Sequence, residues 1–250
     1  MKKGIVFVAF GPEYDKLAAH SARKSREGTN FPFHVITDVR ERDRHPLWKE
    51  VTNVSFRSLE IEDCRFVRTD MAYYSPFEKT LMLDVDSFVR GSDEMLDEHV
   101  FDALSVQAPI IMNEYYHWEK GDRILNLYKE AMKLFKCDLP FSVWNGAIIA
   151  FQNTYPISQF FQRWRNYWVE FGKLRDMPCL GCAAWQWERK YRMKIGKLPD
   201  GFFVVDCPSE KCVVQHHWGR KWYDEVGMDE PHKNHRPKTY AKDFTWTDWP

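Results

Sequence analysis

The sequence predicts an α/β protein with a doubly wound, mostly parallel sheet, and its N-terminal segment gives the main reasons. Residues 4–10 form a continuous apolar run, GIVFVAF, which is typical of a strand covered on both faces. Gly11 and Pro12 then turn the chain into residues 12–28, where an apolar stripe at helical spacing ends at a glycine. A second strand pattern, FHVITD, follows at residues 33–38. This strand–helix–strand order indicates a parallel sheet with helices on both faces.

The alternation of strand and helix patterns continues along the chain. Residues 39–60 are charge-rich and weakly patterned, so no element is assigned there. Residues 61–74 carry one apolar helical face, and Ser75-Pro76 ends it before the apolar strand TLML at residues 80–83. Farther on, the pattern predicts helices at 122–136, 157–171 and 178–193, strands at 144–154 and 202–206, and a last ordered stretch at 213–222.

The domain organisation follows from where this pattern stops. From about Tyr223 the sequence is polar, contains prolines and has no period. We therefore expect residues 1–222 to form one domain and residues 223–250 an extended C-terminal tail. A chain of 250 residues can bury one large core, which agrees with a single domain.

Composition excludes several classes of function. Acidic and basic residues balance at 36 each, so no net charge favours nucleic acid or an anionic membrane surface. The N-terminal apolar run is too short for a signal peptide, and no stretch is long enough to span a membrane, so we expect a cytoplasmic protein without a membrane span. Without a secretory signal, the six cysteines are expected to be free thiols; a zinc site at Cys179–Cys182 and Cys207–Cys212 is the less favoured alternative.

Two carboxylates follow the strand at 80–83 directly, in the sequence TLMLDVDSF. Asp84 and Asp86 would lie at the carboxyl end of the strand, where open α/β sheets bind their ligands. Two like charges at this position call for a cation. An oxygen-preferring ion such as Mn²⁺ or Mg²⁺ fits, because it keeps open positions for phosphate oxygens.

Two further groups of residues could complete a metal–diphosphate site. Arg65 and Arg68 are three residues apart and share a helical face just before the acidic strand, although a solvated helix face is an equally simple interpretation. The segment His216-His217-Trp218-Gly219-Arg220-Lys221 ends a strand with imidazoles and adds a lysine. A single histidine is usually structural, but one that precedes a glycine and a lysine suits a metal–diphosphate site better.

These motifs carry a family resemblance. In order, AFGPEY, SPFEKTLMLDVDSFV, WNGAIIAF and QHHWGRKW resemble a GT-A-fold glycosyltransferase, with the nearest likeness to the family 8 (glycogenin and galactosyltransferase) group. The resemblance implies a Rossmann-like GT-A fold. It also implies a nucleotide-sugar donor, usually a UDP-sugar, held through Mn²⁺, and a carbohydrate or other hydroxyl acceptor.

The resemblance also implies roles for individual residues. The metal ligands would be Asp84, Asp86 and His216, with His217 in place of His216 if the register shifts by one. The residues expected to contact the donor are Tyr14, Asp38, Arg65, Arg68, Asp84, Val85, Gly146, Gly219 and Lys221. The residues expected at the reaction centre are Asn145, which lines the sugar pocket, and Asp176, which opens the helix that faces it.

The sequence leaves the stereochemistry of transfer and two other functions open. In the resembling family the product retains its anomeric configuration, but this chain has Met177 where that family usually has glutamine. Haloacid dehalogenase-type phosphatases also place Asp-x-Asp after apolar residues, although normally on the first strand. A non-catalytic sugar-binding protein that uses the many tryptophans is the third hypothesis.

Overall fold

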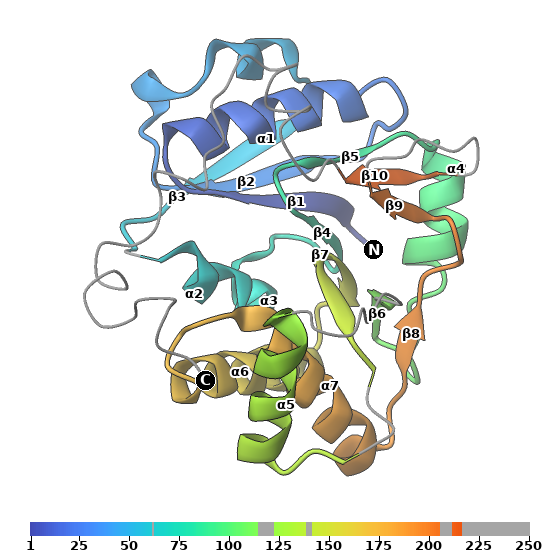
Figure 1. Cartoon of the computed structure of the whole chain (residues 1–250). Coiled ribbons are helices and arrows are strands. Elements are labelled where there is room, and N and C mark those ends of the chain that lie inside the picture. The colour runs from blue at the N-terminus through green and yellow to red at the C-terminus, as the bar shows by residue number, and fades with distance from the viewer. Residues whose placement is uncertain (62, 115–122, 139–141, 206–211, 217–250) are drawn as a thin grey trace.

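The computed structural model describes residues 1–61, 63–114, 123–138, 142–205 and 212–216 (Figure 1). Its centre is a seven-stranded sheet in the order β3-β2-β1-β4-β7-β6-β8. The strands are β1 (Lys3–Ala9), β2 (Phe33–Thr37), β3 (Val54–Ser58), β4 (Lys79–Leu83), β6 (Ile110–Glu114), β7 (Trp144–Gln152) and β8 (Ile195–Lys197). The strand β7 runs antiparallel to β4 and β6, and the other neighbouring pairs are parallel. The predicted mostly parallel α/β sheet is confirmed.

Helices cover both faces of this sheet (Figure 1). The helix α1 (Pro12–Ser25) lies on one face, together with the short turns η1 (Glu41–Asp43) and η2 (Pro46–Glu50). The opposite face carries α2 (Cys64–Arg68), α3 (Met71–Tyr74), α5 (Arg123–Phe135), α6 (Tyr155–Glu170) and α7 (Asp176–Tyr191). The elements α4 (Asp93–Leu96) and η3 (Asp97–Phe101) follow the short strand β5 (Ser87–Val89) in the chain.

The two faces build two apolar cores, because successive side chains of a strand point to opposite sides. On β1, Ile5 and Phe7 belong to the core under α1, where they meet Leu17. Between them, Val6 belongs to the core under α6 and α7, which also contains the fully buried Trp164. This explains why the strand is apolar at every position from Ile5 to Ala9 and not only at alternate ones.

A small three-stranded sheet closes one end of the molecule. It consists of β5 (Ser87–Val89), β10 (Val214–His216) and β9 (Phe203–Val205), with β10 in the middle. The strand β10 pairs antiparallel with β5, which sets His216 opposite Ser87. The last described residues of the chain are thereby fixed beside the segment that follows Asp86.

Several elements differ from the expectation. The single helix predicted at 61–74 is two short helices, α2 and α3. The break lies at Thr69, whose hydroxyl donates to the carbonyl of Arg65, and at Asp70, whose φ of −136° is not helical. The strand β3 occupies part of the weakly patterned segment, and β5, β6 and β8 were not expected. The helix predicted at 178–193 begins two residues earlier, at Asp176. Residues 217–250, and with them the expected tail, lie outside the described residues.

The described cysteines agree with the expected free thiols, since Cys64, Cys137, Cys179, Cys182 and Cys212 form no disulfide. Within the described ranges, no helix combines the length and the apolar character needed to cross a bilayer.

Candidate functional site

The acidic pair lies in a tight turn at the carboxyl end of the buried strand β4. The backbone N–H of Asp84 donates to the carbonyl of Ala147 on β7 (2.9 Å), and the N–H of Ser87 donates to the carbonyl of Asp84 (2.9 Å). The second bond closes a four-residue turn from Asp84 to Ser87. Between the two acids, Val85 is buried in the core under α1, and this anchors the turn.

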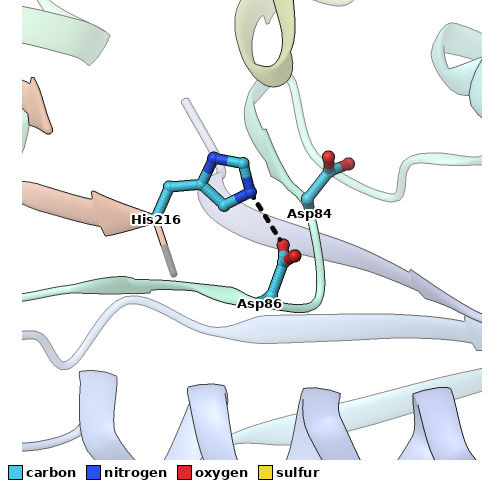
Figure 2. A group of neighbouring side chains, drawn as sticks. All are labelled: Asp84, Asp86 and His216. Atoms are coloured by element: carbon cyan, nitrogen blue, oxygen red, sulfur yellow. Dashed lines mark ion pairs between the residues drawn. The ribbon is translucent and has the colours of Figure 1, made fainter. Parts of the chain in front are cut away.

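The structure brings Asp84, Asp86 and His216 together (Figure 2). One potential ligand atom from each residue lies within 4.8 Å of the others, and His216 Nε2 is 3.2 Å from Asp86 Oδ1. Asp86 and His216 are buried. The imidazole belongs to β10, so the pairing of β10 with β5 delivers it to the turn. His217 lies outside the described residues, as do Gly219 and Lys221.

Arg68 connects this cluster to Asp176. Its Nη1 is 3.1 Å from Asp84 Oδ1, its Nε is 3.6 Å from Asp176 Oδ2, and its Nη2 donates to the carbonyl of Gly146. Burial opposes the charge of Arg68, but Asp84 and Asp176 outweigh that effect, and the pKa of the guanidinium is raised. Arg68 is therefore a fixed positive charge between the acidic turn and the start of α7.

The charges of the site favour a cation. Within the described part of the chain, the guanidinium of Arg68 pairs with Asp84 and Asp176, and the carboxylate of Asp86 adds a third negative charge nearby. Burial raises the pKa of Asp84, and the neighbouring Asp86 adds to the rise while Arg68 opposes it. The partly exposed carboxylate of Asp84, the buried carboxylate of Asp86 and the buried imidazole of His216 form a donor set that suits Mn²⁺ or Mg²⁺. The residues present therefore fit a divalent cation.

Tyr14 lies on α1, close to the acidic turn. Burial raises the pKa of its phenol to about 12, and the negative charges of Asp86 and Asp84 contribute to the rise. Its hydroxyl is therefore neutral at physiological pH.

The side chains of Asp38 and Asn145 each accept a hydrogen bond that orders nearby backbone. Asp38 Oδ1 accepts from the N–H of Gly11 at 2.6 Å and so holds the turn between β1 and α1, where Gly11 has a φ of 88° that favours glycine. Asn145 Oδ1 accepts from the N–H of Ala147 at 2.9 Å and orders the start of β7. The next residue, Gly146, leaves room for the guanidinium of Arg68.

Arg65, which the sequence placed on one face with Arg68, binds Asp63 and the backbone after α6. Its Nη2 is 2.7 Å from Asp63 Oδ2, and its Nη1 donates to the carbonyls of Lys173 and Leu174. Asp63 also caps α2 by accepting from the N–H of Arg65. Asp63, two residues before Arg65, was the local signal in the sequence that could have distinguished the role of Arg65 from that of Arg68.

The contact between Arg68 and Asp176 had no signal in the sequence spacing. It arises because α7 packs on the sheet with its first residue over β7, while the indole of Trp164 on α6 donates to the carbonyl of Asp176 (2.8 Å). Asp176 is 9% exposed, so its carboxylate is held inside the site and not at the surface.

The chain is similar in structure to several known proteins. Neither a protein-family model nor a curated protein matches the chain. Among solved structures, the galactosyltransferase LgtC in complex with donor and acceptor sugar analogs is similar with a TM-score of 0.62 at 14% identity, over 90% of this chain and 95% of that chain. Mouse xyloside xylosyltransferase 1 is similar with a TM-score of 0.57 at 12% identity, over 87% of this chain and 98% of that chain.

The fold is that of the GT-A glycosyltransferases. GlyE of Streptococcus pneumoniae TIGR4 has it as well, with a TM-score of 0.55 at 14% identity, over 92% of this chain and 61% of that chain. The GT-A fold expected from the sequence motifs is confirmed, and the narrower likeness to family 8 stays a prediction.

Proposed function

We propose that the chain is a metal-dependent glycosyltransferase that takes its sugar from a nucleotide-diphosphate donor, a UDP-sugar being the first candidate. The observation that carries the proposal is the cluster of Asp84, Asp86 and His216 at the carboxyl end of β4 in a GT-A fold. The similarity to a galactosyltransferase that binds donor and acceptor sugar analogs supports the same class of substrates for this chain.

The charges of the site suit the departure of a diphosphate. Breaking the bond between the anomeric carbon and a phosphate oxygen leaves an additional negative charge on the diphosphate and an oxocarbenium-like sugar. A cation held by Asp84, Asp86 and His216 would supply positive charge to the departing group. Arg68 is a partly buried guanidinium beside Asp84, and it would stabilise the same charge without having to reorganise.

Asp176 and Asn145 would serve the sugar and the acceptor. Asp176 is a buried carboxylate held against Arg68, and it faces the space where positive charge develops on the sugar in this proposal. The acceptor hydroxyl would attack beside it. Retention of the anomeric configuration, as in the resembling family, is part of the proposal, and Asn145 would line the sugar pocket.

Titration calorimetry with the full chain tests the proposal. We expect saturable binding of UDP that requires Mn²⁺ and disappears with a chelator. The variant Asp86→Asn should lose this binding, because it removes a negative charge from the cluster. The control Asp102→Asn should keep it, since Asp102 is an exposed partner of Lys3 at the opposite end of β1.

The outcome also separates the rival functions. If UDP does not bind the folded wild-type protein in the presence of Mn²⁺, the proposed function is wrong. Nucleotide-independent turnover of an aryl phosphate would point to a phosphatase. Equal binding of free sugars with a chelator present would point to a sugar-binding protein.

A further inference from the structure

Two buried serines of α1 hold the segment that carries the acidic pair. Ser21 and Ser25 are one helical turn apart, and both have 0% exposure. Ser21 Oγ donates to the carbonyl of Val85 at 2.6 Å, and Ser25 Oγ accepts from the N–H of Val89 at 2.9 Å. The two hydroxyls therefore bind the segment at its acidic turn and at its far end on β5.

The bond from Ser21 acts on the central peptide of the turn. The turn runs from Asp84 to Ser87, so the peptide between Val85 and Asp86 is the one whose orientation distinguishes a type I from a type II turn. Such a peptide can rotate while the ends of the turn keep their places. Because Ser21 holds the Val85 carbonyl toward α1, the planar trans peptide directs the N–H of Asp86 to the opposite side.

The orientation of this peptide fixes the backbone of Asp86, and with it the direction of its carboxylate. In the structure that carboxylate meets His216, which β10 presents from the other side. A turn with its central peptide reversed would leave Asp84 in place, because Asp84 is tied to Ala147 on β7, but it would redirect Asp86. Of the two acids, Asp86 is therefore the one that depends on α1.

We propose that Ser21 is a positioning residue for the metal site: its hydroxyl locks the acidic turn in the orientation that brings Asp86 to His216 before a cation binds. The inference rests on the proposed function, because it assumes that the cluster binds a divalent metal. Ser21 touches neither metal nor donor in this proposal, and it acts only through the carbonyl of Val85. The two buried hydroxyls in the mostly apolar interface of α1 are tolerated because both are hydrogen-bonded.

The test compares Ser21→Ala with Ser25→Ala in the full chain. Each variant removes one buried hydroxyl from the same face of α1, so both should lower the thermal midpoint by a similar amount. Mn²⁺ affinity, measured with UDP by calorimetry and without UDP by the paramagnetic resonance of free Mn²⁺, is the readout that a merely structural role would not change. We expect Ser21→Ala to weaken Mn²⁺ binding about tenfold, the effect of about one buried hydrogen bond, and Ser25→Ala to leave it within about twofold of wild type.

Each result decides one statement. Unchanged Mn²⁺ affinity in a folded Ser21→Ala variant overturns the positioning role while the proposed function stands. Equal losses in both variants also overturn it, because they would indicate general loosening of α1. A wild-type protein that binds no Mn²⁺ overturns the proposed function together with this inference. A selective loss in Ser21→Ala supports both.

Discussion

Gly146 offers a direct test of the role assigned to Arg68, because the two residues are in contact. A Cβ added at Gly146 would lie 2.8 Å from Arg68 Nη2 and 3.6 Å from Met177 Cγ. The backbone of Gly146 is outside the left-handed region, so alanine meets no conformational strain there. The substitution Gly146→Ala therefore acts on the guanidinium and not on the strand.

The contact distances at Gly146 determine how far the guanidinium of Arg68 has to move. A carbon atom needs about 3.4 Å or more from its neighbours, so Nη2 has to move by several tenths of an ångström. This movement disturbs the bond to the Gly146 carbonyl and the ion pair with Asp84, which is 3.1 Å long. Hydrogen bonds to charged groups contribute about 1.5–3 kcal/mol each, so a displaced guanidinium that loses one such bond to the diphosphate weakens donor binding roughly 10- to 150-fold. The fold should tolerate the change, because the displaced atom is the end of a flexible side chain.

The assay is Mn²⁺-dependent UDP affinity, followed by turnover once a donor sugar is found. The matched control is Gly196→Ala on β8, whose Cβ would meet Ile111 Cγ1 at the same 2.8 Å but in apolar surroundings away from the acidic turn. We expect a normal UDP affinity for the control. If Gly146→Ala binds UDP as tightly as the wild type while its thermal midpoint is unchanged, Arg68 does not act on the donor as described.

Three other outcomes follow from the structure. Arg65→Ala should lower the free energy of unfolding by about 1–3 kcal/mol and keep UDP affinity. Arg68→Ala should weaken UDP binding at least about tenfold. Equal losses of UDP affinity in the two variants would refute this division of roles. Asp176→Asn should reduce turnover about a hundredfold or more with little change in UDP affinity, and a parallel loss of both would assign Asp176 to binding instead. Burial lowers the pKa of His34 to about 4, below its unfolded value near 6.5. The contribution of the neutral imidazole to stability is therefore complete above about pH 6.5. It is lost as pH falls toward 4, at about 1.4 kcal/mol per pH unit. Chemical denaturation across this range should show a shallower decline for His34→Gln, and identical slopes would contradict the assignment.

The part of the fold that the sequence predicted best is the part fixed by local patterns. The strand β4 is a short apolar run between a Ser-Pro break and two acids, so both its position and the placement of Asp84 and Asp86 at its carboxyl end were readable. The long helices α6 and α7 were predicted for the same reason, since their apolar spacing is regular.

The missed elements depend on contacts that spacing does not contain. The strand β3 is at the edge of the sheet and only partly buried, so it lacks the apolar run that marks β1 and β4. The direction of β7 was also unpredictable, because a strand that is apolar from Ala147 to Phe151 has the same composition whether it runs parallel or antiparallel. Pairing with β4 and β6 alone decides it.

The candidate site divides in the same way. The acidic pair and His216 could be named from motifs, but the different surroundings of Arg65 and Arg68 could not be read from their shared helical spacing. Asp63 captures one arginine locally, whereas Asp176 reaches the other only after α7 has packed on the sheet. Tertiary packing, and not the motif, selects the guanidinium that faces the acids.

The pairing of β10 with β5 has a consequence for how the protein is made. Asp84 and Asp86 belong to the first half of the chain, but His216 reaches them only when β10 docks on β5. Contacts between such distant segments form late, because a long loop must close before they gain any stability. A nascent chain on the ribosome would thus contain the acidic turn long before it could hold a metal with three ligands. In the proposed function, the docking of β10 on β5 is therefore the step that completes the cluster of Asp84, Asp86 and His216.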